Sequence, residues 1–209
     1  MAVTSIRKAG TVAVRPAEPE DAAAIAAIHV TAWHEAYAGL LPDEMIAALT
    51  VEVRQAWWAQ VLSKPAPGPH EAVYLVEVEG RLAGFGVGNA QRSDTLAAGF
   101  DGEIRGPYVV RAAQRRGAGR ALVAATAAGL EQVGHRAVGA WVLRTNVPGR
   151  RFLEGLGGTL INGPEAVRGH GRLTEVAYGW HDVARLVAAA APAPRDGDGR
   201  AAPPPPRTG

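Results

Sequence analysis

The chain has 209 residues, of which 47% are hydrophobic, 20% charged and 6% aromatic, so it is long enough for one globular domain with a buried core. It contains no cysteine, which excludes disulfides, thiolate metal sites and a cysteine nucleophile. Its three serines lie outside any Gly-x-Ser-x-Gly motif. The formal net charge of +2 is too small to indicate a nucleic-acid partner, although the isoelectric point is about 9.3.

The two ends of the chain differ in composition from its middle. Residues 1–10 form a short polar lead without the apolar core of a signal peptide, and we expect them to be flexible. From residue 188 onward alanine and proline dominate, so residues 188–209 are expected to be a disordered tail. Residues 11–187 remain as one folded domain. No apolar run reaches the ~20 residues that span a bilayer, so we expect a cytoplasmic protein without a membrane partner.

Strand and helix patterns alternate along this domain. The expected strands, several of them alternating in hydropathy or bounded by Gly and Pro, are residues 11–15, 72–78, 81–88, 104–110, 137–143, 159–161 and 173–178. The expected helices, with apolar residues at three- and four-residue steps or Pro at the start, are residues 18–39, 42–49, 51–63, 117–134 and 146–156. The early strands form a hairpin and two later ones are joined through a helix. This order predicts the α/β (α+β) class, with a mixed, mostly antiparallel central sheet and helices on both faces.

The most informative segment is the loop that leads from strand 104–110 into helix 117–134. The first amides of a helix lack intrahelical partners and carry partial positive charge, which suits an anion. Gly117 and Gly119 would let a ligand approach the backbone closely. Arg115, Arg116 and Arg120 would add charge-assisted contacts to phosphate oxygens. The segment therefore predicts a pyrophosphate site.

Two common phosphate-binding motifs do not fit this loop. A P-loop would need Lys and then Ser or Thr after its last glycine, and a dinucleotide fingerprint would need a third glycine where Leu122 stands. The sequence that does match is Gln/Arg-x-x-Gly-x-Gly/Ala, at residues 114–119. With the strand before it, the helix after it and the order of the other elements, the chain from about residue 11 to 180 resembles the GNAT superfamily of acyl-CoA-dependent N-acetyltransferases.

The resemblance implies a GNAT fold and an enzyme that uses acetyl-CoA as cosubstrate, without a metal. In such enzymes the strand before the loop splays away from the next parallel strand and its backbone holds the pantetheine arm, while the loop amides hold the pyrophosphate. Carried over to this sequence, the cofactor-binding residues are Val109, Val110, Arg115, Arg116, Gly117, Ala118, Gly119, Arg120, Asn146 and Arg151.

The catalytic assignments leave alternatives open. Glu103 matches the strand position of a base that acts through water on the incoming ammonium; the alternative is a carboxylate paired with Arg105 or another arginine. The family's usual tyrosine acid is replaced by Leu153, which cannot donate a proton. Tyr108 and Tyr178 are the remaining candidates, with packing as the alternative role for either. A thiolate with a pKa near 8.5 could also leave unassisted.

Trp33 and Tyr37 are the candidate acceptor residues. Their i, i+4 spacing puts both rings on one helical face, which could form an aromatic wall for a cationic amine or could simply pack in the core. His29 and His34 are five residues apart and miss the i, i+4 spacing of a helical zinc motif, so no metal site is expected.

The function expected from these residues is acetyl transfer from acetyl-CoA to a primary amine of a small molecule by direct attack. Many relatives in the superfamily form dimers, so a homodimer is compatible with the resemblance. Two alternatives remain: a non-catalytic acyl-CoA-binding sensor, which Leu153 motivates, and an acetyltransferase of protein N-termini or lysines.

Overall fold

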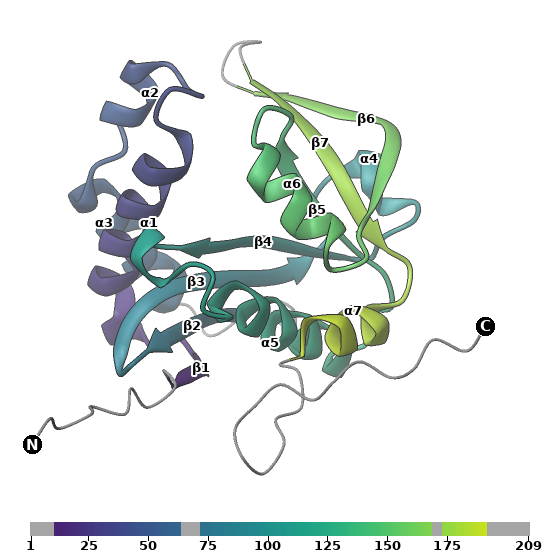
Figure 1. Ribbon diagram of the computed structural model, residues 1–209, viewed down its shortest axis with the longest axis horizontal. Helices are drawn as coiled ribbons and strands as arrows, with labels where there is room; N and C mark the ends of the chain where they lie inside the picture. The colour runs from purple at the N-terminus through teal and green to yellow at the C-terminus, as the bar shows by residue number, and fades with distance from the viewer. Residues whose placement is uncertain (1–10, 64–71, 169–172, 192–209) are drawn as a thin grey trace, which may run out of the picture.

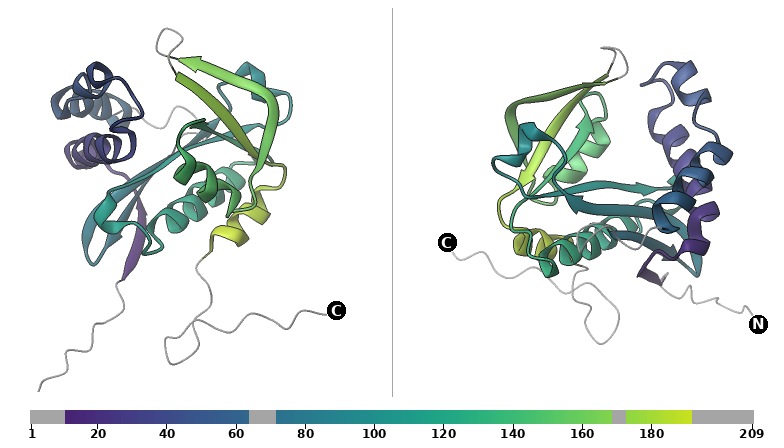
Figure 2. Two further views of the ribbon diagram at one scale, coloured as in Figure 1. Left: turned by 45° about the horizontal axis from the view of Figure 1, so that its top comes forward. Right: turned by 180° about the vertical axis from the view of Figure 1, so that it is seen from behind.

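The computed structural model describes residues 11–63, 72–168 and 173–191, with residues 162–168 described by their backbone alone. Within these ranges the chain forms one mixed sheet covered by helices on both faces (Figures 1 and 2). The fold class predicted from the sequence is therefore confirmed.

The sheet has seven strands in the order β1-β2-β3-β4-β5-β7-β6. All neighbouring pairs run antiparallel except β4 and β5, which are parallel because α5 connects them. The strands are β1 (Val12–Pro16), β2 (Ala72–Val78), β3 (Arg81–Ala90), β4 (Gly102–Val109), β5 (Val138–Leu143), β6 (Thr159–Arg168) and β7 (Leu173–Trp180).

The helices divide between the two faces of the sheet (Figure 2). One group, of α1 and α3, packs on the face that carries Phe85 and Val87, and the other, of α5, α6 and α7, packs on the opposite face. The helices are α1 (Ala22–Tyr37), α2 (Asp43–Ala47), α3 (Val51–Ser63), α4 (Asp94–Ala97), α5 (Ala118–Gln132), α6 (Val147–Glu154) and α7 (Val183–Ala190), with short 3-10 turns at Pro19–Asp21 and Arg111–Ala113.

Glycines in β3 let α5 lie very close to the sheet. A Cβ added at Gly88 would meet the Thr126 methyl group at 2.9 Å, and one at Gly86 would meet the Thr126 hydroxyl at 3.3 Å. Because side chains alternate along a strand, Phe85 and Val87 point to the other face, where they pack with Trp58 of α3. The sequence of β3 thus gives one face without side chains for α5 and one apolar face for α1 and α3.

The structure changes one predicted boundary. Helix α7 continues to Ala190, which is fully buried in the cluster formed by α5, α6, α7, β5 and β7. The domain end expected at residue 187 therefore falls inside a helix. The alanines at the end of α7 were assigned to the tail because alanine is a strong helix former but is also typical of the low-complexity segment that follows. The predicted flexible lead 1–10 and the rest of the predicted tail lie outside the described residues.

Candidate active site

A fork between β4 and β5 forms the centre of the candidate site. The two strands are paired at Gly102 with Val138 and at Glu103 with Gly139, and at no later residue of either strand. From Ile104 onward β4 bonds to β3 on one side, while β5 is paired with β7 along its whole length. The edge of β4 that faces β5 therefore presents backbone donors and acceptors without a strand partner, which can bind an extended ligand.

A bulge shifts the register of β4 within this fork. Phe85 of β3 pairs with Tyr108, but Val87 pairs with Arg105, so Gly106 and Pro107 together oppose one residue of β3. Such a bulge changes the direction of the side chains that follow it, and it lies where the strands have already separated.

The loop after β4 has an anion-binding backbone conformation. Arg115 (φ +61°) and Gly117 (φ +90°) both have left-handed φ values, and α5 has no side-chain N-cap. The first amides of α5 therefore lack partners within the helix, and alternating left-handed residues make the amides of a loop converge. Gln114 ties this loop to the strand, since its Nε2 donates to the Val109 carbonyl at 3.0 Å.

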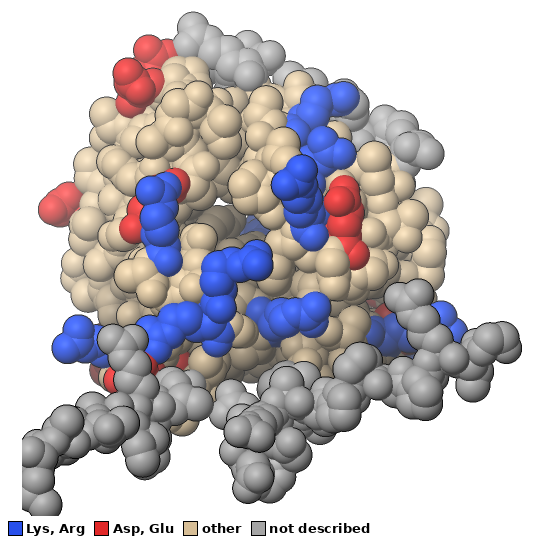
Figure 3. Space-filling view, viewed as in Figure 1, with Lys and Arg blue, Asp and Glu red and all other residues tan. Residues whose placement is uncertain are grey.

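Arginines surround the hollow next to this loop. Figure 3 shows blue side chains along the lower and right-hand rims of a hollow that lies between the α1–α2 side and the α6 side of the molecule. Two of the predicted arginines have protein partners: Arg116 forms an ion pair with Glu79, and Arg120 donates to the carbonyls of Ala189 and Gly155. Arg120 therefore connects the start of α5 to α7 and to the end of α6.

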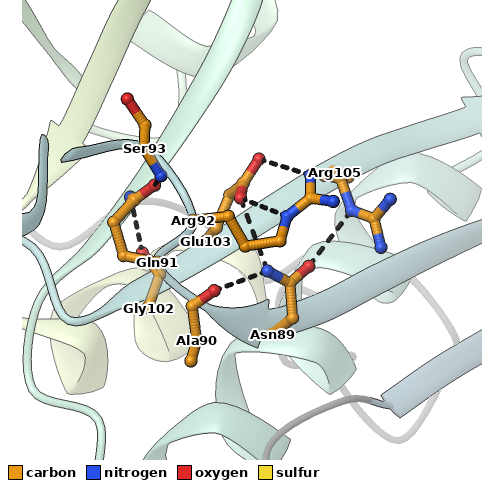
Figure 4. Close-up of polar contacts among 8 residues, drawn as sticks. All are labelled: Asn89, Ala90, Gln91, Arg92, Ser93, Gly102, Glu103 and Arg105. Carbon is orange, nitrogen blue, oxygen red and sulfur yellow. Dashed lines mark hydrogen bonds and ion pairs between the residues drawn. The ribbon is translucent and has the colours of Figure 1, made fainter. Parts of the chain in front are cut away.

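Glu103 is buried, with 5% of its surface exposed, in a polar network on the α1 side of the sheet (Figure 4). Arg92 donates to both carboxylate oxygens, at 3.0 and 3.3 Å, and Asn89 Nδ2 donates to one of them at 3.4 Å. Arg105 donates through Nε to the Asn89 carbonyl oxygen at 3.1 Å. The charge partner of Glu103 is thus Arg92, which the sequence did not single out, and Arg105 is connected to Glu103 through Asn89.

Tyr108 lies against an aromatic cluster on the same face. Its ring stacks on Phe85 with centroids 4.8 Å apart and lies 5.3 Å from the His29 ring. Burial raises the pKa of the Tyr108 hydroxyl; Arg105 opposes this rise, whereas Glu175 and Glu103 add to it. The hydroxyl is therefore within electrostatic reach of carboxylates on two different strands.

His29 is a buried neutral residue that the sequence did not identify as part of this cluster. Trp58 Nε1 donates to its Nδ1 at 3.2 Å, which leaves the ring proton on Nε2. Burial, together with the charges of Arg54 and Arg105, lowers the pKa of His29 to about 4. Two features of the sequence could have indicated that His29 belongs to this cluster. It is four residues from Trp33 on α1, and it is a polar residue on an apolar helix face.

Trp33 and Tyr37 pack together on α1, beside the end of β5. Their ring centroids are 4.9 Å apart, and both pack against the buried cluster of Leu41, Ile46 and Leu143, as does Leu173. Burial raises the pKa of Tyr37, and the nearby Asn146 side chain opposes this rise. Asn146 in addition accepts from the Gly149 amide at 3.0 Å and so caps α6. The predicted substrate residues and one predicted cofactor residue therefore meet at one end of the fork.

On the other side of the fork, Leu153, which replaces the usual acid, and the candidate acid Tyr178 both have structural contacts. Leu153 is buried, at 6% exposed, in the cluster between α5, α6 and α7. Tyr178 packs in the same cluster, donates to Glu154 at 2.6 Å and accepts from Arg150 at 3.2 Å. Burial raises the pKa of Tyr178, and the hydrogen bond to Glu154 adds to this. Of the tyrosines considered, Tyr108 is the one that packs with the α1-side aromatic cluster.

The residues that the structure describes hold no group of three or more His, Asp or Glu side chains arranged to bind a metal ion. No helix within the same ranges is both long and apolar enough to cross a bilayer.

Comparisons with known proteins agree with this architecture. A family model described as the acetyltransferase (GNAT) family matches residues 31–157. The uncharacterized N-acetyltransferase YuaI of Bacillus subtilis is 31% identical over 177 residues, which cover 84% of this chain and 96% of that protein. The structure of PaiA N-acetyltransferase from Thermoplasma acidophilum in complex with coenzyme A is similar with a TM-score of 0.63 at 14% identity, covering 81% of this chain and 99% of that one. YncA from Salmonella typhimurium with its cofactor acetyl-CoA gives 0.59 at 21% identity, covering 81% and 93%.

Proposed function

Because the chain belongs to the GNAT acetyltransferase family, we propose that it transfers the acetyl group of acetyl-CoA to a primary amine of a small molecule. The observation that carries this proposal is the fork between β4 and β5, which opens beside the unpaired amides at the start of α5. An extended acyl-thioester arm needs backbone partners along its length, and its pyrophosphate needs an anion site at one end. The fork and the loop offer these two features side by side.

We assign the cofactor contacts to the residues of that fork and loop. The backbone of Val109 and Val110 would bind the pantetheine arm. The amides of residues 116–120, which include Ala118 and Gly119, would bind the pyrophosphate. Arg115 and Arg151 would contribute charge, and binding would compete with the ion pair of Arg116 and Glu79. Asn146 would act near the far end of the arm, where its side chain affects the pKa of Tyr37.

The reaction requires a free amine. An alkylamine is mostly protonated at neutral pH, so the ammonium must lose a proton before its nitrogen attacks the thioester carbonyl carbon. The new C–N bond forms, the C–S bond breaks and coenzyme A leaves as a thiolate. We assign Glu103 as the base that accepts the ammonium proton through a bridging water molecule. A carboxylate has about four acceptor positions, and Arg92 and Asn89 occupy three of those of Glu103, so one is left for the water.

We assign Tyr108 as the residue that stabilises the departing thiolate of coenzyme A. Burial keeps its pKa above the usual value near 10, whereas a free thiol has a pKa near 8.5. Full proton transfer from the phenol to the thiolate is therefore uphill. The hydroxyl would stabilise the leaving sulfur by a hydrogen bond, and the thiolate would take its proton from solvent.

A non-catalytic acyl-CoA sensor is the second candidate, because Leu153 replaces the usual proton donor with a buried apolar side chain. A screen of small amines and of peptides by thiol release from acetyl-CoA separates the candidates, and the absence of cysteine removes any thiol background from the protein. An enzyme releases coenzyme A with one class of acceptor, whereas a sensor binds acetyl-CoA and releases none. Peptides that outperform free amines would instead identify a protein acetyltransferase.

Glu103→Gln tests the assigned base. We expect kcat to fall by roughly 10²–10⁴-fold with the acetyl-CoA dissociation constant unchanged, because the amide cannot accept the ammonium proton. Glu77→Gln, which changes a half-buried carboxylate of β2 that is paired with Arg15, is a matched control. An unchanged kcat in Glu103→Gln would show that Glu103 has only a structural role with Arg92.

A further inference from the structure

We propose that Glu175 of β7 binds the ammonium group of the acceptor, so that the acceptor is an alkylammonium compound held between this carboxylate and the aromatic wall of α1. The inference rests on the proposed function and extends it, since neither the sequence motifs nor the family resemblance indicated Glu175.

Strand alternation places Glu175 on the side of β7 that faces α1. Its neighbour Val176 belongs to the buried cluster of α5, α6 and α7, and so faces the other way. Two residues before Glu175, Leu173 packs against the same buried cluster as Trp33 and Tyr37. Two residues after it, Ala177 belongs to a cluster with Leu96 of α4. Glu175 therefore lies between these two contacts, on the face of β7 that is turned toward α1.

Its position in the sheet puts Glu175 near the open end of the fork. It pairs in register with Leu143, the last residue of β5, and Leu143 also packs with Trp33 and Tyr37. The charge of Glu175 raises the pKa of both Tyr37 and Tyr108, which agrees with a carboxylate that faces both rings.

Carboxylates contribute to the electrostatic field at this position. At Tyr108 the charges of Glu175 and Glu103 raise the pKa of the hydroxyl, whereas Arg105 lowers it. At Tyr37 the charge of Glu175 also raises the pKa. Faces of aromatic rings add a further attraction for an alkylammonium group. Glu103 would then take the proton, while Glu175 would hold and orient the amine.

The test uses the full chain saturated with coenzyme A and two probes of similar shape, 2-phenylethylammonium and neutral 2-phenylethanol, in calorimetric titrations. We expect the wild type to prefer the ammonium probe, and Glu175→Gln to weaken its binding by roughly 10-fold to 100-fold, as for a charge-assisted hydrogen bond. Glu175→Asp should retain part of the affinity. Glu131→Gln, an exposed carboxylate on α5 at the opposite face of the sheet, is the matched control and should bind like the wild type.

The outcomes separate this proposal from the proposed function. Loss of coenzyme A binding in the wild type would overturn the proposed function. Normal coenzyme A binding with equal affinity for the ammonium probe in wild type and Glu175→Gln would overturn the role of Glu175, as would a wild type that binds neither probe or prefers the alcohol. With any acceptor found by thiol release, Glu175→Gln should raise KM by more than it lowers kcat; the reverse pattern contradicts a binding role.

Discussion

Two glycines at opposite ends of α5 allow the anion site to be tested apart from the stability of the helix. Gly117 precedes α5 with φ +90° and Gly134 follows it with φ +99°, and a Cβ added at either would meet nothing within 4 Å. Replacing either by alanine therefore adds backbone strain without a steric clash. A left-handed conformation costs an L-residue about 1–2 kcal/mol, so each variant should unfold about 2–8 °C lower.

Only Gly117→Ala should affect the cofactor. The alanine reduces its strain by rotating toward φ of about +57°, which turns the neighbouring peptide planes away from the geometry that converges their amides. Loss of one charge-assisted amide contact weakens acetyl-CoA binding about tenfold or more. Thermal unfolding and calorimetric titration of both variants check this. Equal losses of affinity in Gly117→Ala and Gly134→Ala, or normal affinity in Gly117→Ala, would refute the assignment of this loop.

Two further predictions concern His29 and the end of the domain. Burial and the charges of Arg54 and Arg105 lower the folded pKa of His29 to about 4, below its unfolded value near 6.5, so its contribution to stability is complete above pH 6.5 and is lost as the pH falls toward 4. Urea unfolding at pH 7 and pH 5 should show a loss of about 2 kcal/mol that His29→Gln lacks, and an equal loss in both proteins would contradict this. Removing residues 192–209 should leave the unfolding temperature unchanged. Removing residues 188–209 also takes away the buried Ala190 and the contact of Arg120 with Ala189, and should lower the free energy of unfolding by roughly 1–3 kcal/mol. Equal unfolding temperatures for the two truncations would show that the end of α7 is dispensable.

Local patterns in the sequence were sufficient for most elements of the fold. Helix α3 has the predicted bounds, Val51–Ser63, because its apolar spacing and the flanking residues agree. The hairpin around Glu79 and Gly80 was predicted for the same reason, and both residues have positive φ values as the turn requires. The adjacent Trp57 and Trp58 of α3 face different environments and are 38% and 1% exposed.

Elements that depend on weaker local features were missed. Helix α4 has four residues, too few for periodicity to appear. Helix α7 did carry a start feature, since the Asp182 side chain accepts from the Arg185 amide as an N-cap, but the alanine-rich composition obscured it.

The site was predictable where one contiguous segment forms it and not where distant segments meet. The β4–α5 segment contains its own evidence, namely a strand, a loop with glycines and a helix start. The partners of Glu103 come from β3 and the segment after it, and Glu175 reaches the site from β7; such contacts depend on strand order and register. Sequence spacing carries no information on either, so the positions of Arg92 and His29, and the role proposed for Glu175, required the structure.

Calorimetric titration of the wild-type protein with acetyl-CoA, with free coenzyme A as the comparison, tests the central claim most directly. The account predicts micromolar binding of both ligands, because the pyrophosphate and the pantetheine arm that the fork and the loop would hold are common to them. Absence of detectable binding would contradict both the acetyltransferase and the sensor, and the loop before α5 would then be an ordinary helix start.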